Sequence, residues 1–519
     1  MKADRATSIR SYSTAWNVSA GTAVATIGQF IGFVGIIYAA KLFGATTRTD
    51  VIYFALALAG GTVAVLNGFN GNILLPQFLI ARQNGEENDA WRMIRTTFTL
   101  GSVLAIGLMA VGYTRFVEIV MTASHFDERA AREASEAAPV IVLSLYFTYV
   151  VSLLTAIFQG LRNFLVPSVA SAMGSAVGVL ILLLTEETLG ASAIAFGYLA
   201  NVISVSTILW FILARDGRFL CFGWSRFDNA TKVLKLVPPL LLNQLAAAIV
   251  MLYPNYAASA LDGGDLTAIM YARRIFEILP VLIIVPAVTA LGPMLSDLLA
   301  NSTADKAESR LQQISAVLYA ALVPVTVFIL IYADDLMALA YGRGAYGAER
   351  VGFTADNLRL YMLGLIALGS NAVITRALVA TQNVKVAYVS VAFSVTPAVF
   401  LPLFTEMGVS NIGRLGVASG YTAYLLLIHQ PLGYWIWRKT YGQFSLRRQF
   451  TCIIRLGIIS AVAAVTSFLV TYLCSASTIG HVLIAGLVFS CAYTAIHYFL
   501  ATEEYMLLKT ALRRNYVNA

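Results

Sequence analysis

Long apolar stretches separated by short polar breaks recur along the whole chain. A helix needs roughly 20 apolar residues to cross a hydrocarbon core about 30 Å thick. Applied to runs bounded by charged residues or by Gly, Pro and Asn, this length predicts about fourteen spanning helices. They are expected near residues 17–41, 50–80, 96–120, 138–161, 166–186, 189–214, 233–260, 266–296, 311–333, 356–380, 384–405, 412–437, 450–473 and 478–500. The pattern therefore predicts an all-α polytopic membrane protein.

Composition supports this class, since apolar residues fill 59% of the 519 positions and only 12% are charged. The other spanning architecture, the β-barrel, uses strands of about 10 residues that alternate polar and apolar positions, whereas these runs are continuous. The first run, about 25 residues long, exceeds the apolar core of a signal peptide and is expected to be a retained helix. No predicted connection exceeds roughly 25 residues. We therefore expect function to reside within the helix bundle.

The distribution of basic residues predicts the orientation of the chain. With the N-terminus placed in the cytoplasm, 23 of the 35 Lys and Arg residues fall inside, 9 fall outside and 3 lie within spans. Such asymmetry favours an even number of spans with both termini cytoplasmic. It also accounts for the net charge of +8 through loops that face anionic lipid, so no nucleic-acid partner is expected.

Motifs for metal, nucleotide or covalent chemistry are absent from the sequence. The four cysteines and four histidines are scattered and show no metal-ligand spacing. There is no GxxxxGK[ST] phosphate loop, so we do not expect transport driven by the chain's own ATP hydrolysis. We therefore expect neither a cofactor nor a metal site.

Charged residues inside predicted spans are the first candidates for function, because a charge at the bilayer centre costs about 2.5–3.5 kcal/mol on insertion scales. Arg273, Arg274 and Glu277 lie in "IMYARRIFEILP", and Arg376 lies in "SNAVITRALVATQNVK". The arginines either line a wet cavity or extend their heads toward the interface. Arg274 and Glu277, three residues apart, could also form a local ion pair. Asp50, after "GATTRT", is either a gating or packing residue or simply the N-cap of its helix.

Buried amides form a second group of candidates. They interrupt two otherwise apolar helices, in "VLNGFNGNILLP" and "PPLLLNQLAAAIV". In lipid each amide needs hydrogen-bond partners, so such residues either join helices or line a polar path. The residues are Asn67, Asn70, Asn72, Asn243 and Gln244.

A weak internal similarity links the two halves of the sequence. "KLFGATTRTDVIYFAL" continues to "NILLPQF", and "ALDGGDLTAIMYARRI" continues to "ALGPML". Each reads as a Gly-containing turn, a Tyr and then a long helix with a late proline. A true repeat would imply two lobes around a central cavity, as in repeat-built transporters.

Four segments, in order, resemble the signatures of a known family. "FGATTRTDVIYFALAL" with "LLPQFL", "YARRIFEILPVLIIVPAVTALGPMLS", "YGRGAYGAE" and "RALVATQNVK" are similar to the MurJ/MviN lipid II flippases of the multidrug/oligosaccharidyl-lipid/polysaccharide exporter superfamily. The likeness covers nearly the whole chain. It implies a bacterial inner-membrane flippase that moves a polyprenyl-diphosphate-linked glycan, either lipid II or an exopolysaccharide or O-antigen precursor. Transport would proceed by alternating access, with a monovalent ion or the membrane potential as energy source.

The resemblance also implies an architecture and site roles. Two six-helix lobes around a central cationic cavity, residues 17–214 and 215–437, would be followed by two further helices within 438–500, with cytoplasmic termini at 1–16 and 501–519. Arg274 would contact the anionic head group and Arg273 and Arg376 would assist. Asp50 and Glu277 would act in gating or packing, and the amides would line the path. An arginine fits a diphosphate well because it can donate two parallel hydrogen bonds.

The sequence departs from the family at several positions. Gln29 and Gly35 stand in the first helix where family members carry arginines, and "GTVAVLNG" replaces an arginine pair in the second. Arg273 replaces the aspartate of the family's Tyr-Ala-Asp-Arg motif. Three alternatives stay open: an ion-coupled exporter of small molecules, a glycosyltransferase or polymerase acting on lipid-linked glycans, and a scaffold that no longer transports. The missing arginines favour the last of these.

Overall fold

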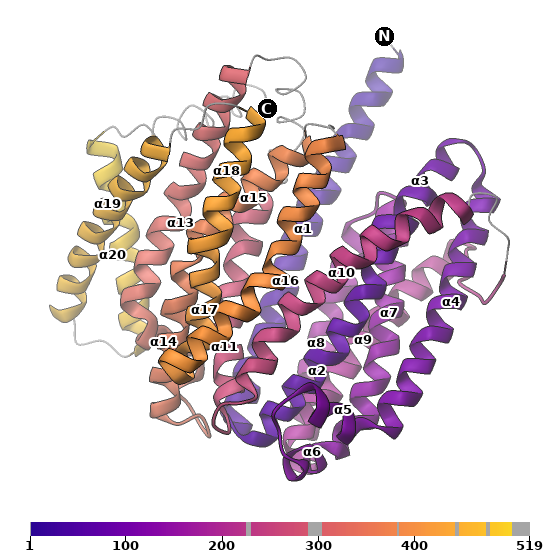
Figure 1. The fold of residues 1–519 in the computed structure, drawn as a ribbon, viewed down its shortest axis with the longest axis horizontal. Helices are drawn as coiled ribbons and strands as arrows, with labels where there is room; N and C mark the ends of the chain where they lie inside the picture. Colours follow the sequence, from indigo (N-terminus) through magenta and orange to yellow (C-terminus); the bar gives the residue numbers. More distant parts are fainter. Residues whose placement is uncertain are drawn as a thin grey trace. The chain divides into compact units, whose positions relative to one another are not determined.

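The computed structural model describes residues 2–224, 230–288, 304–380, 384–441, 446–473 and 478–500, and all regular structure in these ranges is helical (Figure 1). The chain divides into two compact units, Met1–Thr267 and Ala268–Ala519. The all-α membrane fold is thereby confirmed. The lobe boundary after residue 214 stays a prediction, and the tail at 501–519 lies outside the described residues.

The first unit is built from ten helices that precede the unit boundary. They are α1 (Lys2–Phe43), α2 (Thr47–Phe69), α3 (Leu75–Gln83), α4 (Glu87–Thr114), α5 (Phe116–Ala123), α6 (Glu128–Glu133), α7 (Ala138–Gly160), α8 (Leu165–Leu189), α9 (Ala193–Arg215) and α10 (Ala230–Ala258). Helix α11 (Asp265–Leu279) begins in this unit and continues into the second. Helix α10 packs along α2, and α7 contacts α2, α4 and α9.

The second unit contains the remaining described helices. They are α13 (Ala304–Tyr341), α14 (Ala348–Leu363), α15 (Leu365–Ala380), α16 (Val384–Ile412), α17 (Gly416–Tyr424), α18 (Gln430–Tyr441), α19 (Leu446–Leu473) and α20 (Thr478–Phe499). Helix α13 contacts α14, α15, α19 and α20, and α16 packs on α17. The last two helices therefore attach to the second unit through α13.

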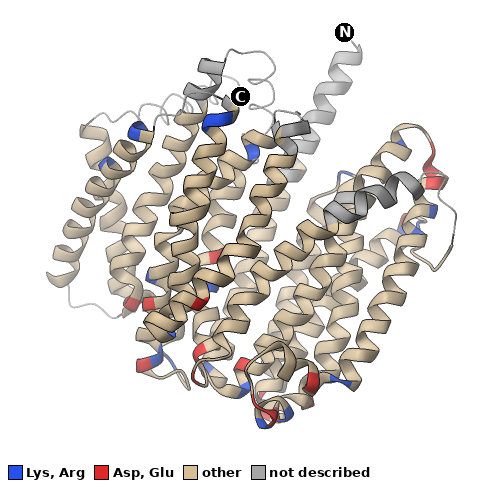
Figure 2. Cartoon of the chain, in the orientation of Figure 1, with Lys and Arg blue, Asp and Glu red and all other residues tan. Residues whose placement is uncertain are grey.

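Ten segments of the described chain are long and apolar enough to cross a membrane. Two of them, Leu165–Arg215 and Tyr388–Thr440, are 51 and 53 residues long and each contains more than one helix. Figure 2 shows that charged residues gather near helix ends and that the helix middles are almost free of them. This is the pattern that a hydrocarbon core imposes. The predicted number of fourteen spans stays a prediction.

Within the described ranges, three five-residue π-helical turns interrupt the long helices. They span Asn70–Leu74, between α2 and α3, Pro280–Ile284, after α11, and Leu425–His429, between α17 and α18. The first and second of these turns follow the two segments whose similarity suggested an internal repeat. Such turns are rare and occur frequently at functional sites.

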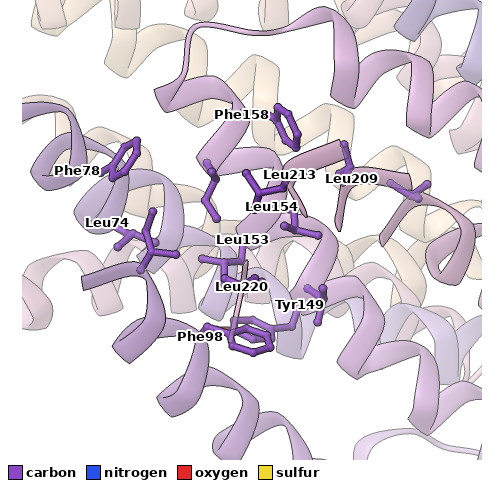
Figure 3. Packing of buried hydrophobic residues seen from close by; sticks show 14 of the residues in the cluster. Leu74, Phe78, Phe98, Tyr149, Leu153, Leu154, Phe158, Leu209, Leu213 and Leu220 are labelled. Carbon is purple, nitrogen blue, oxygen red and sulfur yellow. The ribbon is translucent and has the colours of Figure 1, made fainter. Parts of the chain in front are cut away.

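A buried apolar cluster forms the core of the first unit. Figure 3 shows side chains from α3, α4, α7 and α9 converging there, including Phe78, Phe98, Tyr149 and Leu209. Leu220, which follows α9, enters the same cluster and is 7% exposed. The Tyr149 hydroxyl donates to the Thr97 carbonyl at 2.9 Å, so its polar atom is satisfied within the apolar surroundings.

Helices α8 and α9 approach closely through glycines. A Cβ atom at Gly178 would lie 2.7 Å from the Gly197 carbonyl oxygen, and one at Gly197 would lie 2.7 Å from the Gly178 carbonyl oxygen. Small residues at such crossings bring helix backbones together in membrane proteins, where van der Waals packing drives association.

Replacing Gly178 with leucine should therefore lower the thermal unfolding midpoint of the detergent-solubilised protein, because overpacking typically costs 1–3 kcal/mol. Gly107→Leu on α4 is the matched control, since a Cβ there meets nothing within 4 Å. Differential scanning fluorimetry measures both variants. Equal midpoints for the two would show that the α8–α9 crossing tolerates side chains.

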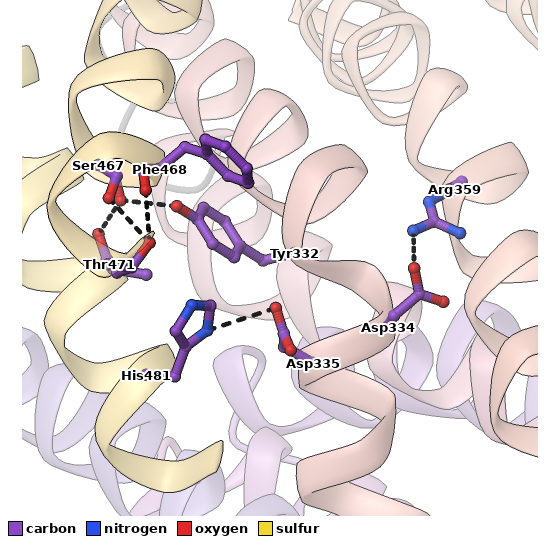
Figure 4. A network of polar contacts seen from close by, with 9 residues as sticks. Tyr332, Asp334, Asp335, Arg359, Ser467, Phe468, Thr471 and His481 are labelled. Atoms are coloured by element: carbon purple, nitrogen blue, oxygen red, sulfur yellow. Dashed lines mark hydrogen bonds and ion pairs between the residues drawn. The ribbon is translucent and has the colours of Figure 1, made fainter. Parts of the chain in front are cut away.

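A polar network joins the last two helices to α13 (Figure 4). The Tyr332 and Ser467 hydroxyls are hydrogen-bonded at 2.9 Å, and Ser467 also donates to the Ala485 carbonyl at 2.8 Å. His481 Nδ1 lies 3.5 Å from Asp335 Oδ2. Tyr332 has non-helical dihedrals (φ −99°, ψ 19°) that kink α13. These contacts connect α13, α19 and α20 without any charge in the helix middles.

Candidate functional site

Asp50 is buried in the first unit, with 2% of its surface exposed. It lies one turn into α2, whose N-cap is Thr46 in a capping box with Thr49. The Asp50 carboxylate accepts hydrogen bonds from the Gly264 amide (2.5 Å), the Thr267 amide (2.8 Å) and the Thr267 hydroxyl (2.6 Å). The alternative prediction that Asp50 caps its own helix is therefore wrong. We call Asp50, Gly264 and Thr267 the Asp50 clasp.

The clasp holds the start of α11 against α2. The first amides of a helix have no intrahelical acceptor, and a carboxylate there also complements the positive end of the helix dipole. Gly264, with φ of +93°, turns the chain so that its amide reaches the carboxylate. Sequence reasoning missed Gly264 and Thr267. The signal that could have found them is the similarity between "GATTRTD" and "GGDLTA".

The amides of α2 meet α7 and α10 in the same unit. Asn70 is 1% exposed, and its Nδ2 donates to the Ser152 hydroxyl on α7 at 3.3 Å. The Oδ1 atoms of Asn67 and Asn70 are buried and accept no hydrogen bond from the described residues. The Gln244 side chain from α10 covers Gly68, where any Cβ would overlap with it. The structure therefore brings Asn67, Asn70 and Gln244 to one segment of α2.

The remaining two predicted amides add little to this group. Asn243 is half-buried beside Gln244 on α10. The side chain of Asn72 lies outside the described residues.

Arg273 lies among aromatic side chains of the second unit. Its Nε donates to Glu277 Oε1 at 2.8 Å, and 24% of its side chain is exposed. Tyr361 on α14 and Tyr421 on α17 lie near the guanidinium. Phe276 stacks on Tyr361 with ring centroids 5.6 Å apart and meets the edge of Tyr421 at 5.9 Å. The sequence suggested Arg274 as the partner of Glu277, whereas the ion pair that the structure shows is made by Arg273.

The two other candidate arginines have different surroundings. Arg274, next to Arg273 on α11, is half-buried. Arg376, four residues before the end of α15, is exposed. Arg274 is thus the one that shares a helix and a partly buried environment with Arg273.

Tyr271, on the same helix, joins two of the signature segments. Its ring stacks on Tyr341 with centroids 4.8 Å apart and lies 5.7 Å from Tyr346. Tyr346 in turn is hydrogen-bonded to the Thr354 hydroxyl. The "YGRGAY" segment therefore supports the beginning of the helix that carries Arg273 and Arg274.

The structure describes the two positions, 29 and 35, at which the first helix lacks the arginines that family members carry. A Cβ at Gly35 would lie 2.8 Å from Val179 Cγ2 on α8, so this position faces a helix contact in the structure. Gln29 is exposed. An arginine at position 35 would collide with α8, and the loss of a cationic side chain there accompanies close α1–α8 packing.

Among the described residues no group of three or more His, Cys, Asp or Glu side chains is placed to hold a metal ion. The polar positions available are the arginines and aromatic hydroxyls of the second unit and the amides of the first. Such groups bind anions and sugar hydroxyls by hydrogen bonds.

Comparison with known proteins identifies the family. The family model described as lipid II flippase MurJ matches residues 39–489. The probable lipid II flippase MurJ of Helicobacter pylori is 22% identical and aligns over 75% of this chain and 88% of that protein. That of Thermotoga maritima is 24% identical over 75% of this chain and 78% of its own length.

Solved structures show the same fold. The inward closed conformation of lipid II flippase MurJ has a TM-score of 0.74 at 16% identity and covers 93% of this chain and 99% of its own. An inward-facing multidrug-resistance MATE transporter of the MOP superfamily has a TM-score of 0.67 at 15% identity, covering 82% and 98%. The family consists of transporters, which sets aside a glycosyltransferase or polymerase. The chain is a multi-pass inner-membrane flippase that belongs to the MurJ family.

Proposed function

We propose that this chain carries lipid II from the inner to the outer leaflet by alternating access. Its membership of the MurJ family over residues 39–489 supports a lipid-linked glycan as the cargo class. The structural observation that carries the proposal is the partly buried arginine pair, Arg273 and Arg274, on an otherwise apolar helix bundle.

Arg273 has the geometry that a diphosphate requires. Glu277 holds its Nε at 2.8 Å, and within the described residues its two terminal nitrogens donate no hydrogen bond. A fixed guanidinium with a free outer edge can donate two parallel bonds to phosphate oxygens. In the proposal Arg274 supplies the second charge, Arg376 assists at the end of α15, and the prenyl tail stays in lipid.

The amides of the first unit suit the neutral part of the cargo. The two buried acceptor oxygens of Asn67 and Asn70 lack donors among the described residues. Leaving such a group unpaired costs about 1–3 kcal/mol. In the proposal they accept from sugar or peptide donors when the cargo is bound, and Gln244 and Asn243 border the same path.

The Asp50 clasp is proposed as one closing contact of the transport cycle. When the start of α11 separates from α2, water can replace the three hydrogen bonds to the Asp50 carboxylate. The closed contact is therefore stable but reversible. The membrane potential is the proposed energy source. Each net negative charge that leaves a cell with an inside-negative potential gains about 2.3 kcal/mol per 100 mV.

Purified protein in proteoliposomes tests the cargo. We expect fluorescent lipid II to cross faster than in vesicles with the Arg273→Ala, Arg274→Ala double variant. A polyprenyl diphosphate bearing an unrelated glycan is the comparison cargo. Faster movement of that compound, with none of lipid II, would assign the chain to an exopolysaccharide or O-antigen type precursor.

A further inference from the structure

The connection between α9 and α10 carries an unusual concentration of exposed aromatic side chains. Residues 218–224, Arg-Phe-Leu-Cys-Phe-Gly-Trp, have no regular secondary structure, and we call them the aromatic strap. Phe219, Phe222 and Trp224 are 57%, 62% and 73% exposed. The proposed transport cycle gives no role to these three large aromatic rings, which are exposed within seven residues.

The strap is nevertheless firmly attached to α4. Leu220 inserts into the core beside Phe98 (Figure 3). The Gly223 amide donates to the Thr99 hydroxyl at 2.9 Å, and this hydroxyl lies 3.0 Å from the Gly223 carbonyl oxygen. The Phe222 ring lies against Phe98 with centroids 5.0 Å apart and keeps its other side exposed, whereas Phe219 and Trp224 are exposed on either side of these attachments.

A second attachment lies at the other end of the strap. The Arg218 guanidinium lies over the Trp91 ring, 5.3 Å from its centroid, and donates to Glu87 Oε1 at 3.2 Å. From Glu87 to Thr99 the helix rises about 18 Å, at about 1.5 Å per residue. The strap therefore follows the first three turns of α4.

The surface of α4 changes from charged to apolar where the strap ends. Before Thr99 the helix carries Glu87, Asp89, Arg92 and Arg95. Beyond it, as far as Val111, the exposed large side chains are apolar: Leu100, Val103, Leu104, Ile106 and Val111. Gly223 and Trp224 therefore lie at the level where α4 passes from water into hydrocarbon.

An irregular backbone cannot lie exposed in the hydrocarbon core, because its amides and carbonyls would lack partners. Exposed Phe and Trp side chains are equally unsuited to bulk water. The headgroup region satisfies both requirements, and Trp is enriched there. Arg95 lies beside Gly223, and Arg215 ends α9 three residues before the strap begins; both are exposed and form no ion pair within the described residues.

We infer that the aromatic strap is an interfacial anchor that binds the headgroup region of one leaflet, with Arg95 and Arg215 taking the phosphates of anionic phospholipids. The distribution of basic residues assigns this leaflet to the cytoplasmic side. The anchor fixes the end of α9 against α4 at the bilayer surface. It does not depend on which cargo the protein carries.

Cys221, which is exposed within the strap, allows a direct depth measurement. A full-length variant that keeps Cys221 as its one cysteine is labelled with a nitroxide and placed in phospholipid nanodiscs. Accessibility to oxygen and to a water-soluble nickel chelate reports depth. Val103→Cys and Glu86→Cys, each introduced into a variant without any native cysteine, mark hydrocarbon and water.

We expect the label at Cys221 to lie between these two references, within the headgroup region. A label as accessible to nickel as that at Glu86→Cys, or as shielded as that at Val103→Cys, would overturn the inference. Transport activity plays no part in this readout, so failure here is distinct from failure of the proposed cargo.

The phosphate contacts are tested with lipid. Native mass spectrometry measures the binding of phosphatidylglycerol, relative to phosphatidylcholine, to the purified full-length protein. We expect this binding to weaken about fivefold for each arginine that is replaced in the double variant Arg95→Gln, Arg215→Gln. Arg115→Gln, at the far end of α4 and paired with Glu118 at 2.7 Å, is the matched control. An unchanged preference for phosphatidylglycerol in the double variant would remove both arginines from the proposed site.

Discussion

Replacing Arg274 with alanine is expected to abolish translocation while the protein remains in the membrane. The side chain is half-buried beside Arg273 in a bundle whose helix middles are almost uncharged, so a cargo diphosphate has few alternative cations (Figure 2). Removing a charge-assisted contact to a partly buried anion costs several kcal/mol in comparable sites, and about 2.7 kcal/mol already reduces a rate a hundredfold. We therefore expect at least a hundredfold loss of lipid II transport.

Two controls separate transport from folding. Arg115→Ala removes an exposed arginine paired with Glu118 and should leave transport unchanged, because such surface pairs contribute about 0–1 kcal/mol. Arg274→Lys retains the charge but loses the fork geometry, and should retain part of the activity. Loss of membrane-inserted protein in Arg274→Ala would instead make the residue structural.

Replacing Asp50 with alanine is the second large effect that we expect. The substitution leaves two amides and the Thr267 hydroxyl without their acceptor in a buried place. At about 1–3 kcal/mol for each unpaired group, the start of α11 should separate from α2. Transport should fall at least tenfold in a proteoliposome assay, with Asp50→Asn intermediate because it retains one acceptor oxygen.

A labelling experiment distinguishes a gating role from simple packing. Thr267→Cys introduces a thiol at a fully buried position of the clasp. A membrane-impermeant maleimide should label it slowly, and faster when Asp50→Asn is added, if the clasp opens and closes during transport. Lower protein stability with unchanged labelling would identify Asp50 as a packing residue.

The spanning helices could be predicted because the bilayer sets their length and forbids charge in their middles. The interruptions of these helices could not be predicted from the sequence. The π-helical turn at Asn70–Leu74 and the kink at Tyr332 depend on packing rather than on local propensity. Helix α13 also continues through Pro324. Sequence rules predict helix ends at prolines, and they do not predict π-helical turns.

The sequence marked candidate residues of the site but not their contacts, and their role in transport stays a prediction. Arg273, Arg274 and Asp50 stood out because charges in apolar runs are expensive. The sequence suggested a pair three residues apart, whereas Glu277 pairs with Arg273, whose neighbours Tyr361 and Tyr421 lie far away in sequence. The partners of Asp50 lie more than 200 residues away and lack any charge that would have marked them.

The most direct test of the central claim is growth of a bacterium depleted of its own lipid II flippase and supplied with this chain, with Arg274→Ala expressed at the same membrane level. Rescue by the unaltered chain and none by the variant is the result that lipid II transport through the arginine pair predicts. Absence of rescue by well-expressed, unaltered protein, with the host's lipid II accumulating in the inner leaflet, would contradict it.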